Sequence, residues 1–305
     1  MRKLFKDGET KLDIETYLSG FDKAEKINVG LSGDDKYHCR RGEEEYLLRI
    51  ADGGDYYEKK KEFDHLKRLS EAGLPVPGCV EFGKTDDGSK VFALLKWVPG
   101  EDLEGVISKL SSREQYEIGM QAGSVLRKIH ETCPETGTDK NWYERYAEII
   151  YPRLDAYRNE GVSFAGSENI LRYFEENKYL LRERPMCHHH GDYHTGNLIV
   201  NDDKLWVIDW HTMDFDSIGE PWYEFNRLDT RYPEFAKGQI DAYFDDDVPD
   251  EFWRLFALYI SVSAITSIVW AKYWAPDKLD DIMGLNRSVL NLFDNMANPI
   301  PKWYR

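Results

Sequence analysis

The stretch from His190 to Asn197 has the sequence HGDYHTGN, and two short apolar runs follow it directly, at residues 198–200 and 205–208. The tetrad between the runs consists of Asn, Asp, Asp and Lys. Short apolar runs separated by such turn-forming residues predict two antiparallel strands joined by a tight turn. A hairpin is therefore expected over residues 198–208, with a loop leading into it.

Three oxygen-bearing side chains lie around this predicted hairpin. Asn197 and Asp209 stand at its two adjacent ends, and Asp192 lies in the loop before it. A hard cation such as Mg²⁺ prefers carboxylate and amide oxygens beside substrate phosphates. The alternative is an ordinary turn at Asp192, with the two hairpin-end residues bound to backbone groups. Because Asp209 follows an apolar strand at the right place, the sequence favours the cation site.

The spacing His-x-Asp-x-x-x-x-Asn is also the order of the protein-kinase catalytic loop. With Gly191 in the second position and the sequence IDW at 208–210, the chain resembles the aminoglycoside phosphotransferase family more than the protein kinases. The resemblance covers nearly the whole chain and implies a role for each residue of the motif. His190 would organise the loop, and Asp192 would accept the proton of an acceptor hydroxyl or orient that hydroxyl. Asn197 and Asp209 would hold Mg²⁺.

The same resemblance implies an α+β fold of two lobes, similar to that of protein kinases. Residues 1–98 are expected to form a nucleotide-binding lobe with a five-stranded antiparallel sheet and one helix. Residues 99–305 are expected to form a larger, mainly helical lobe with the catalytic loop and the acceptor site. A chain of 305 residues exceeds one typical domain and suits this division.

A glycine-bearing turn lies between two predicted strands near the N-terminus. Gly30, Ser32 and Gly33 belong to it, and glycine lets backbone N–H groups approach phosphate oxygens. An ordinary hairpin turn would have the same composition, and the sequence is neither a Walker A motif nor the GxGxxG of protein kinases. The position of the turn before the next strand favours contact with a nucleotide.

The next predicted strand, residues 45–51, carries the cation Arg49 among apolar residues. In the helix predicted over residues 57–72, Glu62 shares the inward face with leucines at i+4 and i+7. We therefore predict that Arg49 and Glu62 form the strand-to-helix ion pair that kinases make with Lys and Glu beside the nucleotide phosphates. Glu58, one turn earlier, is the competing acid. Two solvated charges are the remaining alternative.

Two more strands are predicted at residues 79–83 and 90–96 and complete the small sheet. Pro99-Gly100 then separates the last strand from a helix, as expected of a connection between lobes. In the family that the chain resembles, this connection offers backbone hydrogen bonds to adenine. The resemblance therefore assigns Trp97 and Val98 to nucleotide binding.

Helical periodicity dominates the rest of the chain. A capping box at Ser111 begins a predicted core helix that ends at His130, and two further helices are predicted over residues 141–157 and 168–181. His130 is assigned a structural role, because histidine at a helix C-terminus is stabilised by the helix dipole. The family usually braces its catalytic loop with an Asp near position 224, and Glu224 departs from that pattern.

Composition disfavours two classes of partner. The net charge of −16 disfavours nucleic acid, because proteins that bind it normally present a basic face. Residues 255–271 carry no formal charge, but Ser and Thr interrupt them, so we predict a buried helix and no membrane span. Four cysteines without CxxC spacing and a start without an apolar segment predict a cytoplasmic protein.

The expected function is phosphoryl transfer from ATP or GTP, with Mg²⁺, to a hydroxyl of a small molecule. The predicted large lobe carries excess acids at Asp214, Asp216, Glu220, Asp245, Asp246, Asp247 and Glu251. Their field favours a cationic, aminoglycoside-like acceptor. The alternatives are a kinase for choline or another metabolite, and a nucleotide-binding pseudokinase. A monomer and a homodimer are both compatible with the sequence.

Overall fold

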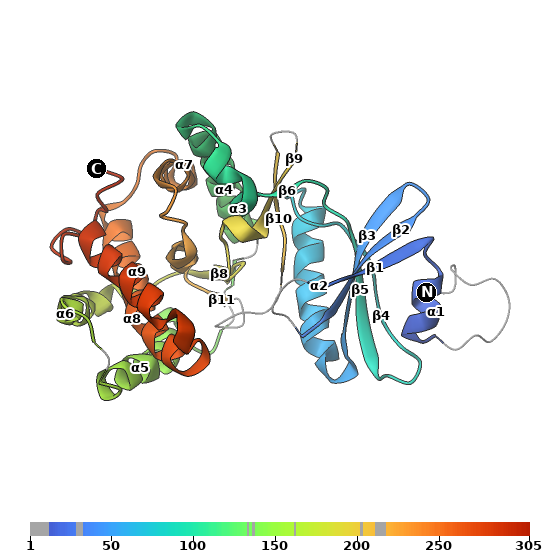
Figure 1. Ribbon diagram of the computed structural model, residues 1–305, viewed down its shortest axis with the longest axis horizontal. Coiled ribbons are helices and arrows are strands. Elements are labelled where there is room, and N and C mark those ends of the chain that lie inside the picture. Colours follow the sequence, from blue (N-terminus) through green and yellow to red (C-terminus); the bar gives the residue numbers. More distant parts are fainter. Residues whose placement is uncertain are drawn as a thin grey trace. The chain divides into compact units, whose positions relative to one another are not determined.

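The computed structural model describes residues 12–28, 33–132, 134–135, 138–161, 163–201, 204–210 and 218–305. The chain divides into two compact units, shown in Figure 1. Unit 1 comprises Met1–Asp102 and Asn197–Thr212, and unit 2 comprises Leu103–Gly196 and Met213–Arg305. The segment with the predicted hairpin therefore groups with the N-terminal strands.

Unit 1 contains a five-stranded antiparallel sheet with the strand order β1-β2-β3-β5-β4. Its strands are β1 (Lys23–Ile27), β2 (Asp35–Arg41), β3 (Glu44–Asp52), β4 (Cys79–Lys84) and β5 (Lys90–Lys96). The predicted sheet is confirmed. The strand predicted over residues 45–51 is present as β3, and residues on both of its faces are buried.

The two faces of this sheet have different covers (Figure 1). On one face, Leu48 and Ile50 of β3 join a core with Tyr17 of the short helix α1 (Ile14–Ser19). On the other face, Arg49 lines a pocket with Phe63 of helix α2 (Tyr56–Glu71). The sequence predicted α2, whereas the six-residue α1 was missed.

The predicted hairpin is present as β9 (Leu198–Asn201) and β10 (Lys204–Val207), with Leu198 opposite Val207. Strand β6 (Glu101–Asp102) pairs with β9 on its other side. Gly100 precedes β6 with a φ of 138°, and a Cβ there would lie 2.5 Å from the carbonyl oxygen of Val200. Only glycine fits this close approach of two backbones.

Unit 2 is mainly helical. Its helices are α3 (Leu103–Val106), α4 (Ser112–Thr132), α5 (Trp142–Asn159), α6 (Ser167–Asn177), α7 (Pro233–Phe244), α8 (Asp250–Trp274) and α9 (Leu279–Leu292). A small sheet joins β7 (Pro134–Glu135), β8 (Met186–His188) and β11 (Ile218–Gly219) in the order β11-β8-β7. The capping box at Ser111 is confirmed, since its side chain and backbone both bind Glu114. Glu224 lies in the 3-10 helix Pro221–Arg227.

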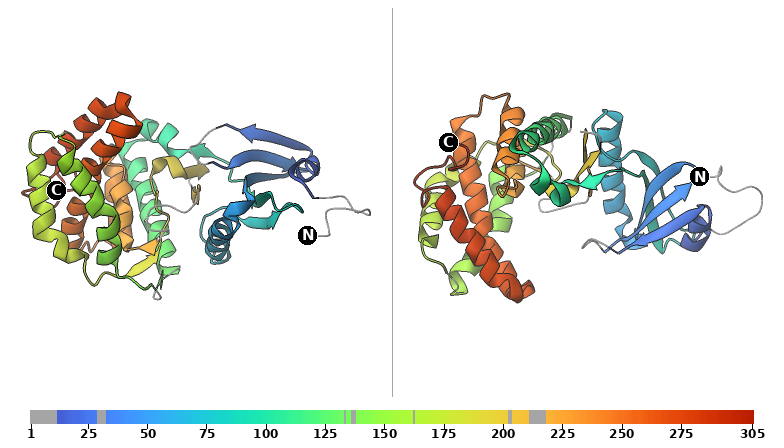
Figure 2. Two further views of the ribbon diagram at one scale, coloured as in Figure 1. Left: turned by 90° about the horizontal axis from the view of Figure 1, so that it is seen from below. Right: turned by 45° about the horizontal axis from the view of Figure 1, so that its top comes forward.

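Close helix packing fixes the core of unit 2. Helices α4 and α7 touch through their backbones, because a Cβ on Gly119 or Gly123 would lie 2.2 or 2.1 Å from a carbonyl oxygen of α7. Figure 2 shows these helices and the pair α8 and α9 running beside one another. Among the described residues, α8 is the one helix long and apolar enough to cross a membrane, and 72% of its most apolar window is buried inside the protein.

Candidate active site

A buried carboxylate holds the start of the predicted catalytic loop in unit 2. Glu224 Oε2 accepts a hydrogen bond from the backbone N–H of His190 at 2.8 Å, and Oε1 accepts one from Gly191 at 2.6 Å. The residue is only 2% exposed. The longer Glu side chain therefore makes the brace that the resemblance implied for an Asp.

The surroundings of Glu224 favour its ionised form. His130 Nε2 lies 3.4 Å from Glu224 Oε2, and His130 Nδ1 lies 2.8 Å from the hydroxyl of Tyr243. Burial alone would raise the pKa of Glu224, but the neighbouring imidazoles of His189 and His130 lower it to about 2. Glu224 is therefore a carboxylate at neutral pH. Its two backbone bonds are charge-assisted and correspondingly strong.

Two further contacts fix the second half of the loop. The buried Tyr193 donates from its hydroxyl to the carbonyl oxygen of Ala122 at 2.8 Å. Thr195 Oγ1 donates to Asp229 Oδ2 at 2.9 Å, and Asp229 in turn accepts from Arg231 at 2.8 Å. The loop is therefore held through backbone N–H groups at its start and through the side chains of Tyr193 and Thr195 further on.

Asp192 lies between these anchors, and its side chain is 22% exposed. Its backbone N–H donates to His190 Nδ1 at 3.2 Å, so His190 contacts the loop, while its organising role stays a prediction. Its carboxylate lies 3.3 Å from His194 Nε2 and 3.5 Å from Arg227 Nε. Burial alone would raise the pKa of Asp192, but His194 and Arg227 lower it to about 2. Asp192 is therefore an ionised, half-buried carboxylate on a loop that hydrogen bonds hold in place.

The sequence reasoning missed His194 and Arg227 as partners of Asp192. His194 lies inside the motif, two residues after Asp192, so its position was a usable signal. Arg227 follows Glu224 by three residues in the same 3-10 helix, which has three residues per turn. The brace and the cation therefore lie on one face of that helix.

In unit 1, the structure brings the two predicted metal ligands together. The N–H of Ile208 donates to the carbonyl oxygen of Asn197 at 3.0 Å, so Asn197 and Asp209 lie at adjacent ends of the hairpin. Asp209 has a φ of 60°, in the left-handed region that non-glycine residues rarely adopt. Its Oδ1 lies 3.6 Å from Lys36 Nζ and 3.8 Å from Arg49 Nη1.

These residues fit a bound Mg²⁺. Asp209 and Asn197 offer a carboxylate and an amide oxygen, the ligand types that Mg²⁺ accepts alongside phosphate oxygens and water. In the described part of the chain no three His, Cys, Asp or Glu side chains gather as a metal cluster. Phosphate oxygens and water can complete the ligand set of a Mg²⁺ held by two protein oxygens, and the cations Lys36 and Arg49 suit the phosphates.

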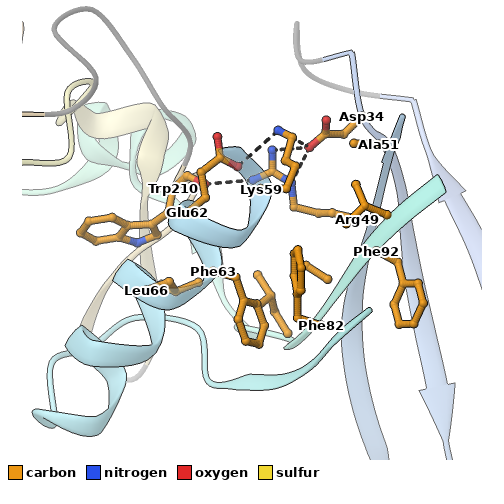
Figure 3. A pocket seen from close by; sticks show the side chains of 13 residues that line it. Asp34, Arg49, Ala51, Lys59, Glu62, Phe63, Leu66, Phe82, Phe92 and Trp210 are labelled. Atoms are coloured by element: carbon orange, nitrogen blue, oxygen red, sulfur yellow. Dashed lines mark hydrogen bonds and ion pairs between the residues drawn. The ribbon is translucent and has the colours of Figure 1, made fainter. Parts of the chain in front are cut away.

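Figure 3 shows the pocket beside Arg49. The predicted ion pair between Arg49 and Glu62 is not formed. Arg49 instead pairs with Asp34 at 2.7 Å, while Glu62 pairs with Lys59 at 3.2 Å. Lys59 also lies 3.2 Å from Asp34 and so joins the two pairs. The competing acid Glu58 is exposed to solvent.

Apolar walls surround this charged cluster. They are formed by residues including Phe63, Leu66, Phe82, Phe92 and Leu95. Arg49 Nη1 also donates to the carbonyl oxygen of Trp210 at 3.1 Å, which ties β3 to the segment after the hairpin. Burial alone would raise the pKa of Asp34, but the charges of Arg49 and Lys59 hold it below its ordinary value. Asp34 is therefore ionised at neutral pH.

Only some of the remaining residues predicted to contact the nucleotide lie in the described part of the chain. Gly30 and Ser32 lie outside the described residues, whereas Gly33 is described and directly precedes Asp34. Trp97 stacks on the His38 ring at 4.0 Å and donates its backbone N–H to the carbonyl oxygen of Glu45 at 3.0 Å. Val98 follows it and is half-buried. Their contact with adenine stays a prediction.

Three of the acids expected to attract a cationic acceptor, Glu220, Asp245 and Glu251, pair with arginines of the protein itself. Glu220 is fully buried, with its Oε1 2.8 Å from Arg184 and its Oε2 accepting from Tyr259 at 3.1 Å. It therefore serves the core of unit 2. Asp245 forms an ion pair with Arg127, and Glu251 lies 3.3 Å from Arg184. Asp214 and Asp216 lie outside the described residues.

Comparisons with known proteins agree with this arrangement. A family model described as the phosphotransferase enzyme family matches residues 23–254. Acyl-CoA dehydrogenase family member 10 of Mus musculus is 23% identical over 268 residues, which are 78% of this chain and 24% of that protein. This chain therefore spans about a quarter of the length of that relative.

Two solved structures illustrate the shared fold. A choline/ethanolamine kinase family protein from Mesorhizobium loti is 14% identical with a TM-score of 0.62, over 92% of both chains. A thermostable mutant of aminoglycoside phosphotransferase APH(4)-Ia, in ternary complex with AMP-PNP and hygromycin B, is 15% identical with a TM-score of 0.61. That match covers 93% of this chain and 99% of the other. The predicted protein-kinase-like fold is confirmed, and because the family model spans most of the sequence, the chain belongs to the phosphotransferase enzyme family.

Proposed function

We propose that this protein is a kinase-type enzyme that transfers the γ-phosphate of ATP, or of GTP, to a hydroxyl group of a small molecule. The observation that carries the proposal is the ionised Asp192 on a loop held by Glu224 through two backbone N–H groups and by Asp229 through the hydroxyl of Thr195. Phosphoryl transfer depends mainly on positioning and charge stabilisation, so a fixed carboxylate is the group it requires.

Asp192 would mainly orient the acceptor hydroxyl. It would take the proton of that hydroxyl only late in the reaction. An efficient general base has a pKa near the working pH, whereas the pKa of Asp192 is about 2. In a loose transition state the hydroxyl needs little activation before the phosphoryl group has largely left the nucleotide. A carboxylate that accepts a hydrogen bond from the hydroxyl and takes its proton late satisfies both conditions.

Asn197 and Asp209 are the residues proposed to hold Mg²⁺ beside the nucleotide phosphates. When bound, the metal neutralises the charge of the phosphate oxygens during transfer. Arg49 binds phosphate oxygens with its planar guanidinium, which suits a bidentate grip. Lys36, 3.6 Å from Asp209, adds a second positive charge to the same region.

The acceptor proposed is cationic and aminoglycoside-like. The net charge of −16 and the exposed acids Asp245, Asp246 and Asp247 support this choice through their field. Similarity to a structure solved with hygromycin B points to the same class. The second candidate is an amino alcohol such as choline or ethanolamine, which the similarity to a choline/ethanolamine kinase family protein favours.

An acceptor panel tests the proposal. Nucleotide consumption is measured with aminoglycosides, choline, ethanolamine, macrolides and neutral sugars, at low and at physiological salt. Turnover with aminoglycosides is expected. Their affinity should fall at higher salt, because exposed charge pairs are screened over about 10 Å at roughly 0.1 M ionic strength. Turnover confined to uncharged acceptors would overturn the choice of acceptor. Nucleotide binding without turnover on any acceptor would favour the pseudokinase alternative.

A further inference from the structure

One carboxylate oxygen in unit 1 collects three cationic donors. Oδ2 of Asp34 accepts from Arg49 Nε at 3.0 Å and from Nη2 at 2.7 Å, and it lies 3.2 Å from Lys59 Nζ. Figure 3 shows these side chains converging from the end of a turn, from β3 and from α2. A guanidinium fork and an ammonium around one oxygen is an arrangement with which proteins hold a phosphate oxygen.

The cluster is buried and its charges balance. The side chains of Asp34 and Arg49 are 7% and 9% exposed, and that of Lys59 is 20% exposed. Counting the described residues and including Asp209 beside Arg49, three cations, Lys36, Arg49 and Lys59, face three anions, Asp34, Glu62 and Asp209. A phosphate entering beside Arg49 would add negative charge to a low-dielectric site, which is costly unless a carboxylate leaves.

Asp34 is the carboxylate placed to leave. Glu62 is tied to Lys59 three residues away on one helix, so the two move together. Asp34 instead follows Gly33, at the end of the turn that the sequence predicted to approach phosphates. Among the described residues, no heavy atom lies within 4 Å of a Cβ built on Gly33, so none of them crowds the chain at that position.

We propose that Arg49 and Lys59 together form the phosphate-binding pair of this protein, and that Asp34 occupies the place of a nucleotide phosphate oxygen until the nucleotide displaces it. The inference rests on the proposed function, since it takes a nucleotide as the ligand. Glu62 then pairs with the phosphate-binding cation Lys59 on the same helix and not with Arg49, the partner that was expected. The competing account is a permanent salt bridge in which Asp34 orients Arg49.

Calorimetric titrations separate these accounts. ATP, ADP and adenosine are titrated into the full chain without Mg²⁺ and at fixed ionic strength, using wild type, Asp34→Asn and Lys59→Met. Asp52→Asn and Lys67→Met are the matched controls, because Asp52 pairs with Lys90 and Lys67 with Glu71 in exposed ion pairs. Adenosine reports binding that needs no phosphate.

Asp34→Asn is expected to tighten ATP binding and Lys59→Met to weaken it, each by roughly 10-fold, the size of one charge-assisted contact. Adenosine affinity and both controls should stay at the wild-type value. Weaker ATP binding by Asp34→Asn, at wild-type thermal stability, would overturn the displacement and support the permanent salt bridge.

Lys59→Met tests the proposal even if Asp34→Asn does not fold, because it leaves the pair of Asp34 and Arg49 intact. Unchanged ATP affinity in Lys59→Met would overturn this inference alone. A wild-type protein that binds neither ATP nor GTP would overturn the proposed function together with it.

Discussion

The catalytic loop of unit 2 and the charged pocket of unit 1 each contain a buried carboxylate, but different kinds of group bind the two carboxylates. Glu224 is held by two backbone N–H groups of the loop itself. Asp34 is held by the side chains of Arg49 and Lys59. Backbone donors are fixed by the fold, whereas long cationic side chains exchange partners by rotating. The loop is therefore built to stay in place and the pocket is built to exchange one anion for another.

This difference matches two separate requirements of phosphoryl transfer. The acceptor hydroxyl needs a carboxylate at a constant position, because small misplacements of reacting groups are costly. The nucleotide must enter and leave in every cycle, so its binding site needs charges that are compensated in both states. The predictions below test whether the two regions are separable in this way.

Replacing Asp209 by Asn should weaken Mg²⁺-dependent nucleotide binding by roughly 10- to 100-fold, since a charge-assisted ligand is lost. Titration of ATP with and without Mg²⁺ measures this effect. Asp35→Asn is the control, because Asp35 pairs with Lys26 in an exposed ion pair on β2. Unchanged Mg²⁺ dependence in Asp209→Asn would move the metal site elsewhere.

Replacing Glu224 by Gln should lower the transfer rate by roughly 10-fold or more, because an amide N–H would face a backbone N–H and shift the loop. The free energy of unfolding should fall by about 2 to 4 kcal/mol, as expected for a disrupted buried network. Denaturation and saturating-substrate kinetics measure the two quantities.

Glu220→Gln is the matched control for this variant. Glu220 is equally buried, but it binds Arg184 and Tyr259 and not the catalytic loop. Its loss should destabilise the fold to a similar extent and leave the transfer rate near that of wild type. Equal losses of transfer in both variants would contradict a specific brace by Glu224.

The pH profile should show the smallest effect. A lowered pKa keeps Asp192 ionised until the pH falls towards about 2, so protonation of this residue should not reduce the transfer rate between about pH 5 and 8. Arg227→Met should raise the pKa of Asp192 towards its ordinary value of 3.8 without creating an acid limb in that range. Transfer rates at saturating substrate, measured across this pH range for wild type and Arg227→Met, test this expectation. A fall in the rate on acidification inside this range, in either protein, would contradict this expectation.

Local sequence patterns predicted most of the framework on which these two regions depend. The apolar residues of the strand predicted over residues 45–51 and the turn-forming residues at 201–204 are local patterns, so the sheet and the hairpin were foreseeable. The order of polar residues from His190 to Asn197 can likewise be read from the sequence alone. The short helix α1 has too few residues to show a helical period.

Partner choice among charged residues was not predictable in the same way. Face periodicity put Arg49 and Glu62 on facing surfaces, but it contains no information about Asp34, which β2 brings beside β3. Glu220 resembled a surface acid because its partner Arg184 is 36 residues away. Such pairs depend on tertiary packing, and they determine which charges are available to a ligand.

The most direct test measures nucleotide affinity and phosphoryl transfer on the same preparations of wild type, Asp192→Ala and Lys59→Met. Asp192→Ala should lose transfer by about 10²- to 10⁴-fold and keep its ATP affinity, because its carboxylate acts on the acceptor. Lys59→Met should lose roughly 10-fold in ATP affinity and recover transfer at saturating ATP. If both variants lose affinity and transfer in the same proportion, the separation between a fixed catalytic loop and an exchangeable phosphate pocket is contradicted.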